Sequence, residues 1–457
     1  MVIRALMWMS IALAAAVPPS APPPSAPPPA DPLRGRLGGP ATVDEQGPNA
    51  FSLPVPALST EDRRAFSVGN ALFRDNWVAA PASVDSRDGL GPLFNANSCS
   101  ACHQEDGRGR PPERAGEVGL GLVVFVSPEA MDGAPHPTYG KQLQDQAVTG
   151  VPPEVALEMK PTLLRGSFDD GESWEMRRLD VVIDRPAYGP VGAVRTSARI
   201  GPQLIGGGLL EAVPDAAIVA REDIDDRDGD GISGRAHRLG ESGRVGRFGW
   251  KASQPTLDHQ VRAALHEDIG ITSAEHPSES LTVAQRGTVD APSGGSPEID
   301  AHRVARIAHY CRTLAVPAQR GIDSAAVMRG QQVFAEIGCS ACHVPELKTD
   351  QSSPVPQLRG VAFQPFTDLL LHDMGDGLAD HRADGEASGR EWRTPPLWGI
   401  GLLETVNGHA NYLHDGRART LQEAVLWHGG EAERARTAFT KLPKSDREAI
   451  LAFLRSL

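Results

Sequence analysis

One pentapeptide, Cys-Ser-Ala-Cys-His, occurs twice in this chain of 457 residues, at positions 99–103 and 339–343. Two thiols three positions apart can form thioether bonds to the two vinyl groups of one haem, and the histidine that follows can bind the iron. Because the chain has only five cysteines, two chance copies of this pattern are improbable. The duplication therefore predicts two covalently bound c-type haems. The residues that would hold them are Cys99, Cys102 and His103 at the first site and Cys339, Cys342 and His343 at the second.

Two other uses of paired cysteines compete with haem. A zinc site needs further Cys or His ligands placed for a tetrahedron, and a redox-active dithiol does not need the histidine. Both are disfavoured because the N-terminus is typical of export to a compartment where c-type haem is attached. The fifth cysteine, Cys311, lies among apolar residues at helical spacing and is predicted to be an inert core thiol. No pair of cysteines then remains for a disulfide.

The first 17 residues are typical of a secretory signal peptide. Arg4 supplies a positive charge, and a short apolar run as far as Val17 ends in small residues. That run is shorter than the roughly 20 residues of a membrane-spanning helix, and no later segment is long and apolar enough to span. Residues 18–52 begin with a stretch rich in Pro, Ala and Ser and are predicted to be an extended tether. We therefore expect a soluble periplasmic protein.

Helical periodicity predicts a mainly α fold with long loops and a few short strands. Helices are expected near residues 60–78, 139–147, 214–221, 256–266, 299–314, 323–336, 420–428 and 444–456, and a strand at 122–126. We expect two cytochrome-c-like haem domains, residues 53–315 with a large insertion and residues 318–457. The net charge of -13 argues against nucleic acid as a partner, because phosphate binding needs clustered Lys and Arg.

Several motifs around these sites resemble the bacterial di-haem oxidoreductase family of peroxidase-like proteins, some of which have been labelled thiol oxidoreductases. The motifs follow the family's order from about residue 55 to the C-terminus. They are residues 89–99 with 106–112, Tyr139–Gln144, Pro202–Ala212, Gly246–Ala252 and Leu371–Gly375. The resemblance implies a di-haem enzyme of the peroxidase type.

The C-terminal part is also similar to the wider group that contains di-haem cytochrome c peroxidases and the di-haem enzyme that matures methylamine dehydrogenase. The similarity rests on residues 393–398, 412–417 and 420–425. In that group, the residue fourteen positions beyond the His of a His-Asp-Gly step binds the C-terminal haem iron, and here that residue is His428. The resemblance implies a bis-histidine, low-spin haem. Alternatively, His428 ends a helix, where its charge suits the dipole, and Met374 is the ligand.

For the N-terminal haem, no equally placed sixth ligand is found, as expected for an open iron that binds peroxide. Splitting the O–O bond requires a base that moves a proton from the near oxygen to the far one. The stretch that begins at Trp250 is similar to the group's Trp, Leu, Gln and distal Glu run, with a shorter spacing and Asp in place of Glu. The resemblance points to Asp268 as the distal acid, with Glu267 second and Glu211 third. The alternative is that these are solvated charges or caps at helix ends.

Two further features of the sequence suggest functional roles. Trp250 is either a relay for electrons between the haems or an ordinary buried indole with its N–H satisfied. Residues 226–232 match the front half of a calcium loop, with ligands expected from Asp226, Asp228, Asp230 and the carbonyl of Ile232. The twelfth position is His237 instead of Glu, so the loop is not an EF-hand. The alternative is an acidic surface turn.

These observations lead to one functional expectation with two alternatives. The C-terminal haem would collect electrons from an external donor, such as a small cytochrome, a cupredoxin or a quinol-linked protein, and pass them to the N-terminal haem, where hydrogen peroxide is reduced. Alternatively, peroxide drives the oxidation of another substrate, such as a protein, or the chain is an electron-transfer subunit in which both irons have six ligands.

Overall fold

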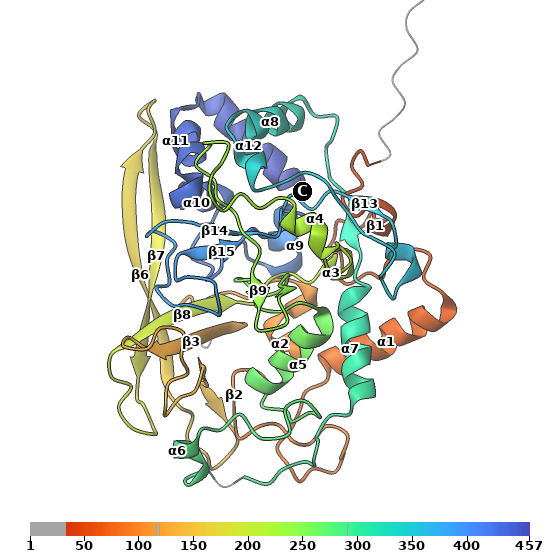
Figure 1. Cartoon of the computed structure of the whole chain (residues 1–457), viewed down its shortest axis with the longest axis vertical. Coiled ribbons are helices and arrows are strands. Elements are labelled where there is room, and N and C mark those ends of the chain that lie inside the picture. Colours follow the sequence, from red (N-terminus) through yellow and green to blue (C-terminus); the bar gives the residue numbers. More distant parts are fainter. Residues whose placement is uncertain (1–32, 115–116, 118, 290) are drawn as a thin grey trace, which may run out of the picture. The chain divides into compact units, whose positions relative to one another are not determined.

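The chain contains both helices and strands in this computed structural model, which describes residues 33–114, 117, 119–289 and 291–457 (Figure 1). The predicted signal peptide and residues 18–32 of the predicted tether lie outside the described residues. The model is 28% helix and 18% strand. The fold is therefore mixed, with more strand than the mainly α fold we expected. Residues 33–457 form one compact unit.

The helices of the described residues are α1 (Thr60–Arg74), α2 (Cys99–Cys102), α3 (Gly207–Glu211), α4 (Asp215–Val219), α5 (Leu257–Glu267), α6 (Val283–Arg286), α7 (Ala301–Arg312), α8 (Ala325–Glu336), α9 (Leu403–Asn407), α10 (Leu421–Leu426), α11 (Glu433–Lys441) and α12 (Lys444–Ser456). The strands are β1 (Thr42–Val43), β2 (Leu93–Phe94), β3 (Leu122–Pro128), β4 (Gln142–Leu143), β5 (Gln146–Ala147), β6 (Ala156–Ser167), β7 (Ser173–Asp184), β8 (Val194–Ile200), β9 (Arg238–Leu239), β10 (Arg244–Val245), β11 (Val316–Pro317), β12 (Leu347–Lys348), β13 (Ala362–Phe363), β14 (Leu371–Asp373) and β15 (Glu391–Arg393).

Helices α1 and α7 pack closely beside the first pentapeptide. Helix α1 begins at Ser59, whose side chain accepts a hydrogen bond from the backbone N–H of Asp62, as an N-cap does. Gly69 allows the close approach, because a Cβ there would collide with the backbone of Arg306 in α7. At the end of α1, Phe73 lies 6.3 Å from the ring of His103. This helix pair therefore forms one wall of the first predicted haem site.

A second helix pair, α8 and α12, stands beside the second pentapeptide. Gly330 of α8 lets the backbone of α12 approach, since a Cβ would collide with Ala449. Phe334 of α8 and Phe453 of α12 pack edge to face at 5.3 Å. Phe334 also lies 6.2 Å from the ring of His343. The packing of α8 on α12 thus positions the second histidine as α1 and α7 position the first.

A three-stranded antiparallel sheet, in the order β4-β3-β8, leads directly to the first site. Strand β3 pairs with β8 along its whole length, from Leu122 opposite Ile200 to Pro128 opposite Val194. Because β8 ends at Ile200, the sheet fixes the position of the next residues, Gly201 and Pro202. Those two residues contact His103, as described below.

The long hairpin of β6 and β7 runs along one side of the molecule (Figure 1). Its tip is held against the C-terminal helices: Phe168 is 2% exposed and packs at 6.1 Å against Phe439 of α11. The buried guanidinium of Arg447 in α12 contacts the face of Phe168 and donates to Asp170 and Glu172 at 2.9 and 2.7 Å. The hairpin therefore joins the middle of the chain to its C-terminal part.

Most of the expected helices are present, with two corrections. Helices near 60–78, 214–221, 256–266, 299–314, 323–336, 420–428 and 444–456 correspond to α1, α4, α5, α7, α8, α10 and α12, and the strand at 122–126 to β3. The helix predicted at 139–147 is wrong, because this stretch forms β4 and β5, which pair with β3 and β2. Residues 33–52 are not part of a tether: Leu37 and Phe51 are fully buried, and β1 pairs with β11.

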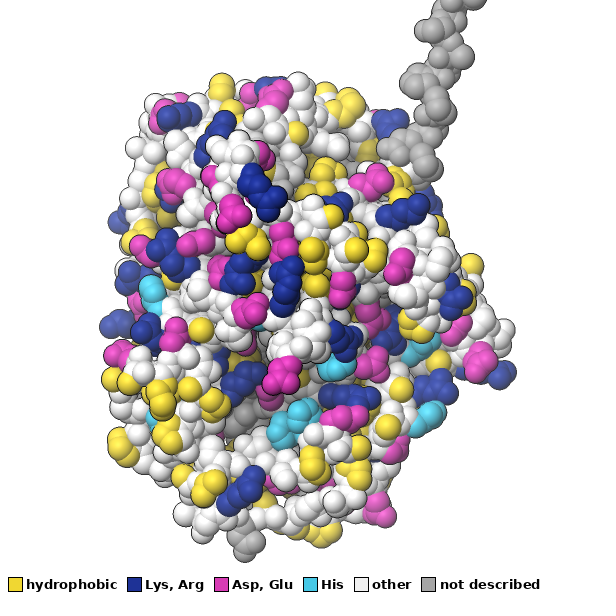
Figure 2. Space-filling model, viewed as in Figure 1, with side chains coloured by type: hydrophobic (Ala, Val, Ile, Leu, Met, Phe, Trp, Pro, Cys, Tyr) yellow, Lys and Arg dark blue, Asp and Glu magenta, His cyan; other side chains and the backbone are white. Residues whose placement is uncertain are grey.

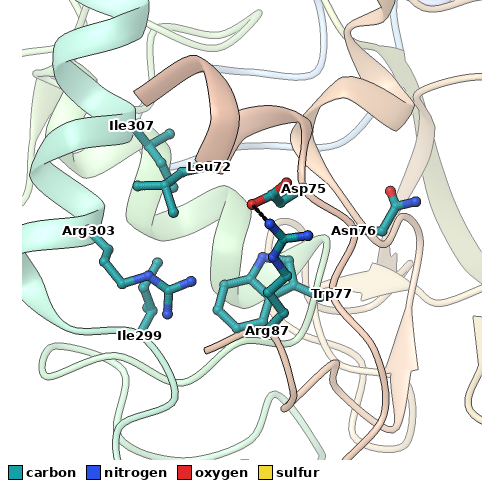
Figure 3. A pocket seen from close by; sticks show the side chains of 8 residues that line it. All are labelled: Leu72, Asp75, Asn76, Trp77, Arg87, Ile299, Arg303 and Ile307. Carbon is teal, nitrogen blue, oxygen red and sulfur yellow. Dashed lines mark ion pairs between the residues drawn. The ribbon is translucent and has the colours of Figure 1, made fainter. Parts of the chain in front are cut away.

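The surface drawn in Figure 2 carries mixed charges, and the cavity beside α1 and α7 is too small for a substrate. Charged side chains of both signs are interspersed over the face drawn in Figure 2. A cavity beside α1 and α7, lined by Trp77, Ile307 and the Asp75–Arg87 ion pair (Figure 3), has a volume of about 10 Å³. That is enough for one water molecule at most. Within the described residues, no helix combines the length and the apolar character needed to cross a bilayer.

The hairpin tip yields a stability prediction. Phe168→Ala should weaken the docking of β6–β7 on α11 by about 3–5 kcal/mol, because it removes a buried ring and leaves a cavity. The expected result is faster hydrogen exchange of the β6–β7 amides, measured by mass spectrometry. Leu163→Ala is the control in the same hairpin, since Leu163 is 47% exposed. Equal protection in wild type and Phe168→Ala would contradict the assigned role of the tip.

Candidate haem centres

His103 is held so that only one of its ring nitrogens is free. Its Nδ1 lies 2.8 Å from the carbonyl oxygen of Pro202 and must donate to it, which leaves the Nε2 lone pair for a metal. The neighbouring Gly201 passes so close to the ring that a Cβ there would lie 2.8 Å from Cε1. This contact explains why glycine stands at this position, directly after β8.

The thiols of the first pentapeptide lie in the short helix α2. Burial, followed by the negative charge of Asp268, raises the pKa of Cys99 to about 12 and also raises the pKa of Cys102. A reactive dithiol needs a lowered pKa, so the redox-dithiol alternative is not supported. Cys311 is 5% exposed in α7, and its pKa is raised well above the usual value by burial, as expected for an inert core thiol.

Asp268 follows α5 directly and faces this first site. Its Oδ1 accepts a hydrogen bond of 2.8 Å from Nε2 of Gln142, and burial raises its pKa to about 7. No cation of the described residues pairs with it, because the nearby Lys141 pairs with Glu267 at 3.0 Å. The two acids that the sequence placed first and second therefore differ: Glu267 is neutralised by a lysine, and Asp268 is not.

At the second site, the rings of two histidines lie close together. Nδ1 of His343 donates to the carbonyl oxygen of Phe366 at 2.9 Å, and Nδ1 of His428 donates to that of Ala424 at 2.7 Å. The ring centres are 6.4 Å apart. Two imidazoles that bind one iron from opposite sides, with bonds of about 2 Å, place their ring centres about 6 Å apart. Burial lowers the pKa of both histidines, His343 to about 4, and so favours the neutral, metal-binding form.

A third histidine, His372, lies beside this site but is fully engaged. Its Nε2 lies 2.8 Å from Asp368 and its Nδ1 lies 2.6 Å from Glu431. Burial alone would lower the pKa of His372, yet the hydrogen bonds to Asp368, Cys342 and Glu431 hold it well above its usual value. Cys342, Asp368 and His372 are close enough to share a metal, but Cys339 and His343 are not in that group, so no four-ligand zinc site forms from the described residues.

Three buried guanidinium groups, those of Arg108, Arg382 and Arg393, form no ion pair within the described residues. Arg108 is 5% and Arg393 6% exposed, and burial lowers the pKa of each to about 10. Nε of Arg108 has no hydrogen-bond partner. Burying an unpaired charge is costly, so an anion bound beside these arginines would stabilise the fold. The carboxylates of a haem carry that charge, and these arginines are therefore suited to hold haem propionates.

One protein-family model, described as "Di-haem oxidoreductase, putative peroxidase", matches residues 35–118 and 191–457. The chain belongs to this family. The resemblance stated from the motifs is thereby confirmed, and with it the prediction of a di-haem oxidoreductase. Membership implies two haems, in agreement with the two Cys-x-x-Cys-His segments.

The family match omits residues 119–190, which contain β3 to β7 and the Tyr139–Gln144 stretch that we counted among the motifs. No curated protein matches the sequence. Among solved structures, a chain of hydrazine synthase from Kuenenia stuttgartiensis, studied under 20 bar of xenon, is similar at 15% identity and a TM-score of 0.38. The similarity covers 99% of this chain and 100% of that chain.

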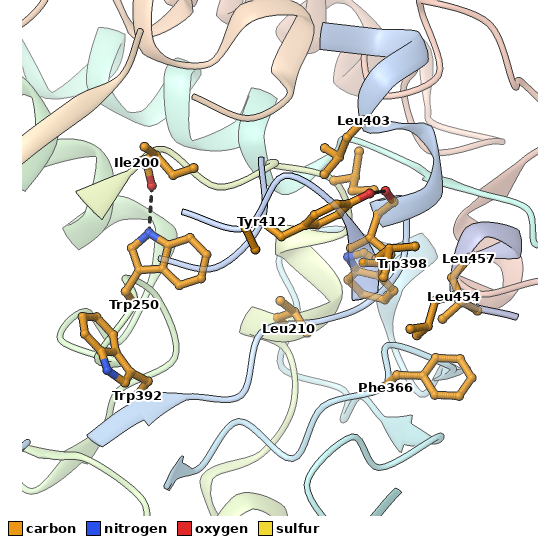
Figure 4. Close-up of a cluster of buried hydrophobic side chains, with 14 of the residues drawn as sticks. Ile200, Leu210, Trp250, Phe366, Trp392, Trp398, Leu403, Tyr412, Leu454 and Leu457 are labelled. Carbon is orange, nitrogen blue, oxygen red and sulfur yellow. Dashed lines mark hydrogen bonds between the residues drawn. The ribbon is translucent and has the colours of Figure 1, made fainter. Parts of the chain in front are cut away.

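Trp250 is buried and is bonded to the end of strand β8, which leads to the first site. Its Nε1 donates to the carbonyl oxygen of Ile200 at 2.8 Å, and the ring of Trp392 lies near it (Figure 4). The N–H of Ile200 in turn donates to the carbonyl oxygen of His414, whose ring stacks on Trp392 at 3.7 Å. The guanidinium of Arg108 lies 5.1 Å from the Trp250 ring centre.

The remaining predicted residues lie apart from these centres. Glu211 pairs with Arg312 and accepts from the backbone N–H of Leu257, so it caps α5 instead of facing the first site. In the acidic loop, Asp223, Asp226 and Asp228 bring carboxylate oxygens within 4.8 Å of one another. Asp223 was not among the expected ligands. The backbone N–H of Ile232 donates to Asp230 at 2.8 Å.

Reasoning from the sequence missed several residues of these sites. Arg108 and Arg393 stand inside quoted motifs but carry no local pattern that separates a buried arginine from an exposed one. Asn95 and Gln142 also stand in quoted motifs, and Asp145 follows one directly.

Proposed function

We propose that this di-haem oxidoreductase is an exported, periplasmic enzyme that reduces hydrogen peroxide at its N-terminal haem with electrons received at its C-terminal haem. The reaction is H2O2 + 2H⁺ + 2e⁻ → 2H2O. One observation carries the proposal: Asp268 is a carboxylate without a cation partner among the described residues, its pKa is raised to about 7, and it lies beside the first pair of haem cysteines. An electron carrier has no need of such a group, whereas peroxide reduction needs a proton carrier of this pKa.

The chain offers a complete set of groups for two haems. Cys99 and Cys102 would form the thioethers of the first haem and His103 its axial bond, and Cys339, Cys342 and His343 would do so for the second. We assign His428 as the second axial ligand of the C-terminal haem, in preference to Met374, because its ring centre lies 6.4 Å from that of His343. The bound haems would supply electron transfer and the reduction of peroxide.

Asp268 would hold and move the proton. As a carboxylate it accepts the proton of the peroxide oxygen nearest the iron, and as a carboxylic acid it donates that proton to the far oxygen. Its hydrogen bond from Gln142 keeps Oδ1 in place and leaves the other oxygen for the substrate. Glu267 is the second choice, since its ion pair with Lys141 already satisfies it.

Trp250 would serve electron transfer between the two sites. Its N–H bonds to Ile200, two residues before the carbonyl group that holds His103, so the indole is tied to the first site through a short stretch of backbone. The nearby guanidinium of Arg108 disfavours a lasting positive charge on the ring. We therefore assign Trp250 to the path of the electron and not to storage of an oxidised indole.

The organisation and the partners follow from the same proposal. Residues 53–315 and 318–457 would be the two haem domains, and the electrons would come from a small cytochrome, a cupredoxin or a quinol-linked protein. The pattern of residues 1–17 supports export.

For residues 226–232 we propose a calcium site, with Asp223 as a ligand beside Asp226, Asp228, Asp230 and Ile232, because the carboxylates of Asp223, Asp226 and Asp228 converge.

Replacing the proposed acid tests the function directly. Asp268→Asn keeps an oxygen for the bond from Gln142 but cannot carry the proton, so kcat/KM for peroxide should fall about a hundredfold or more at unchanged haem content. In wild type, kcat/KM should fall as the pH drops through about 7, because a base with a raised pKa is lost when it is protonated. Stopped-flow kinetics measures both effects.

Three outcomes would contradict this proposal. A greater loss in Glu267→Gln than in Asp268→Asn would move the role to Glu267. A protein that is wholly low-spin, does not bind cyanide and does not react with peroxide would be an electron-transfer subunit. Oxidation of a co-purified protein at the expense of peroxide would indicate the remaining alternative, a peroxide-driven oxidase.

The second axial ligand is tested by spectroscopy. His428→Ala should remove one axial bond and convert the C-terminal haem from low-spin to high-spin, as seen in the optical and electron paramagnetic resonance spectra. His302→Ala, at an exposed position of α7, is the matched control and should leave the spectra unchanged. If the spectra of His428→Ala are identical to those of wild type, His428 is not a ligand and Met374 becomes the candidate.

The calcium proposal is tested by thermal unfolding. Calcium at about a hundred times its Kd should stabilise the wild type by about 2.7 kcal/mol and raise its Tm. The double variant Asp226→Asn/Asp228→Asn should show no such rise, and magnesium serves as the control ion. A wild-type Tm that does not respond to calcium would identify the loop as an acidic surface turn.

A further inference from the structure

Asp145 is a second carboxylate without a cation near the first haem site. It follows β4 and belongs to residues 119–190, the part of the chain that the family match omits. Its Oδ1 accepts a hydrogen bond of 3.0 Å from Nδ2 of Asn95, and burial raises its pKa to about 6. Among the described residues, no Lys, Arg or His forms an ion pair with it. Asp145 thus resembles Asp268 in all but its partner amide.

The two carboxylates are joined by a bridge of two side-chain amides. Nε2 of Gln142 donates to Oδ1 of Asp268 at 2.8 Å and to Oδ1 of Asn95 at 2.7 Å, and Nδ2 of Asn95 donates to Asp145. The donors and acceptors fix the orientation of both amides. The backbone holds the bridge as well, because the N–H of Asn95 donates to the carbonyl oxygen of Asp268 at 2.8 Å.

Both ends of the bridge face the haem attachment. The carboxylates of Asp268 and Asp145 each contribute to raising the pKa of the Cys102 thiol. The bridge is also anchored to the entry of α2, since strand β5 pairs with β2, which ends five residues before Cys99. The insertion therefore places Asp145 beside the same cysteine pair as Asp268.

The wall around the bridge has more acceptors than donors. Besides the two carboxylates, Oε1 of Gln142 and Oε1 of Gln144 are buried without a hydrogen-bond partner, and the two side chains are 4% and 6% exposed. Unpaired buried acceptors are costly. A wall of this kind binds protons, or molecules that donate them, such as hydrogen peroxide.

We propose that Asp145 is a second proton-exchanging group of the N-terminal haem pocket and acts with Asp268 as a pair held by Asn95 and Gln142. This inference rests on the proposed function. Reduction of one H2O2 to two H2O consumes two protons and two electrons, the electrons coming from the external donor. One carboxyl group holds one proton, and the pair holds both. Asp268 first moves the peroxide's own proton from the near oxygen to the far one, which leaves as water, and Asp268 and Asp145 then each take up one proton from solvent and deliver both to the second water.

Fluoride binding tests the pair without turnover. A fluoride ion that enters the open iron site of the oxidised protein is stabilised when nearby carboxylates take up protons. Above pH 7, where both acids of the free protein are ionised, the logarithm of Kd should therefore rise with pH at a slope that approaches two in wild type. Asp145→Asn should reduce the slope to one or less, as should Asp268→Asn. The optical spectrum reports Kd.

Two further variants separate a proton carrier from a structural residue. Asp145→Asn keeps an oxygen for the bond from Asn95, and Asp145→Glu should restore the wild-type slope. Glu154→Gln is the matched control: Glu154 is 2% exposed, its pKa is raised to about 8 by burial, and it bonds to the backbone of Gln144 and not to the bridge. It should keep the wild-type slope.

The outcomes distinguish this inference from the proposed function. If wild type reduces peroxide and binds fluoride but Asp145→Asn keeps the wild-type slope, the pair is wrong and the proposed function stands. If wild type neither binds fluoride nor reduces peroxide, the proposed function fails and the pair with it. A slope of one in wild type, lost only in Asp268→Asn, would leave Asp268 as the single acid.

Discussion

The Nδ1–H groups of His103, His343 and His428 each donate to a backbone carbonyl oxygen, and this leaves all three Nε2 lone pairs free for iron. The acceptor carbonyls belong to Pro202, Phe366 and Ala424, which different parts of the fold position. The first follows strand β8, the second lies in a loop against α8 and α12, and the third is in α10. The helices and the small sheet are thus arranged to aim imidazole rings. A shift of any of these carbonyls would turn a ring.

The charged side chains of the interior also indicate that the fold is suited to hold haem. Arg108 and Arg393 are buried without a carboxylate partner among the described residues, although the chain has 58 acidic side chains. A fold that leaves cations unpaired while acids are plentiful is completed by anions from outside the chain. Haem propionates would supply them, so haem attachment would stabilise this fold as well as enable its chemistry. His372, by contrast, already has two carboxylates and needs no such group.

The parts predicted from the sequence are those that local pattern determines. Cys-x-x-Cys-His spacing is fixed by the porphyrin, and helices α1, α5 and α12 show an apolar periodicity of their own. The helix predicted at residues 139–147 was wrong because this stretch forms strands that pair with β2 and β3, and such pairing is not visible in the local sequence. Burial of Leu37 and Phe51 depends in the same way on β11 and the C-terminal part. The pairing of Asp145 with Asp268 spans more than a hundred residues, and no local signal encodes it.

The insertion changes what the family pattern alone implies about the pocket. Asn95 and Asp268 lie in the matched part of the chain, whereas Gln142 and Asp145 lie in residues 119–190. Half of the amide bridge therefore comes from a segment outside the family model, through strands β4 and β5. That segment also carries the β6–β7 hairpin, whose tip is held by Phe439 and Arg447 of the C-terminal helices. One continuous segment thus reaches from the side chains of Gln142 and Asp145 beside the first predicted haem site to the helices beside the second.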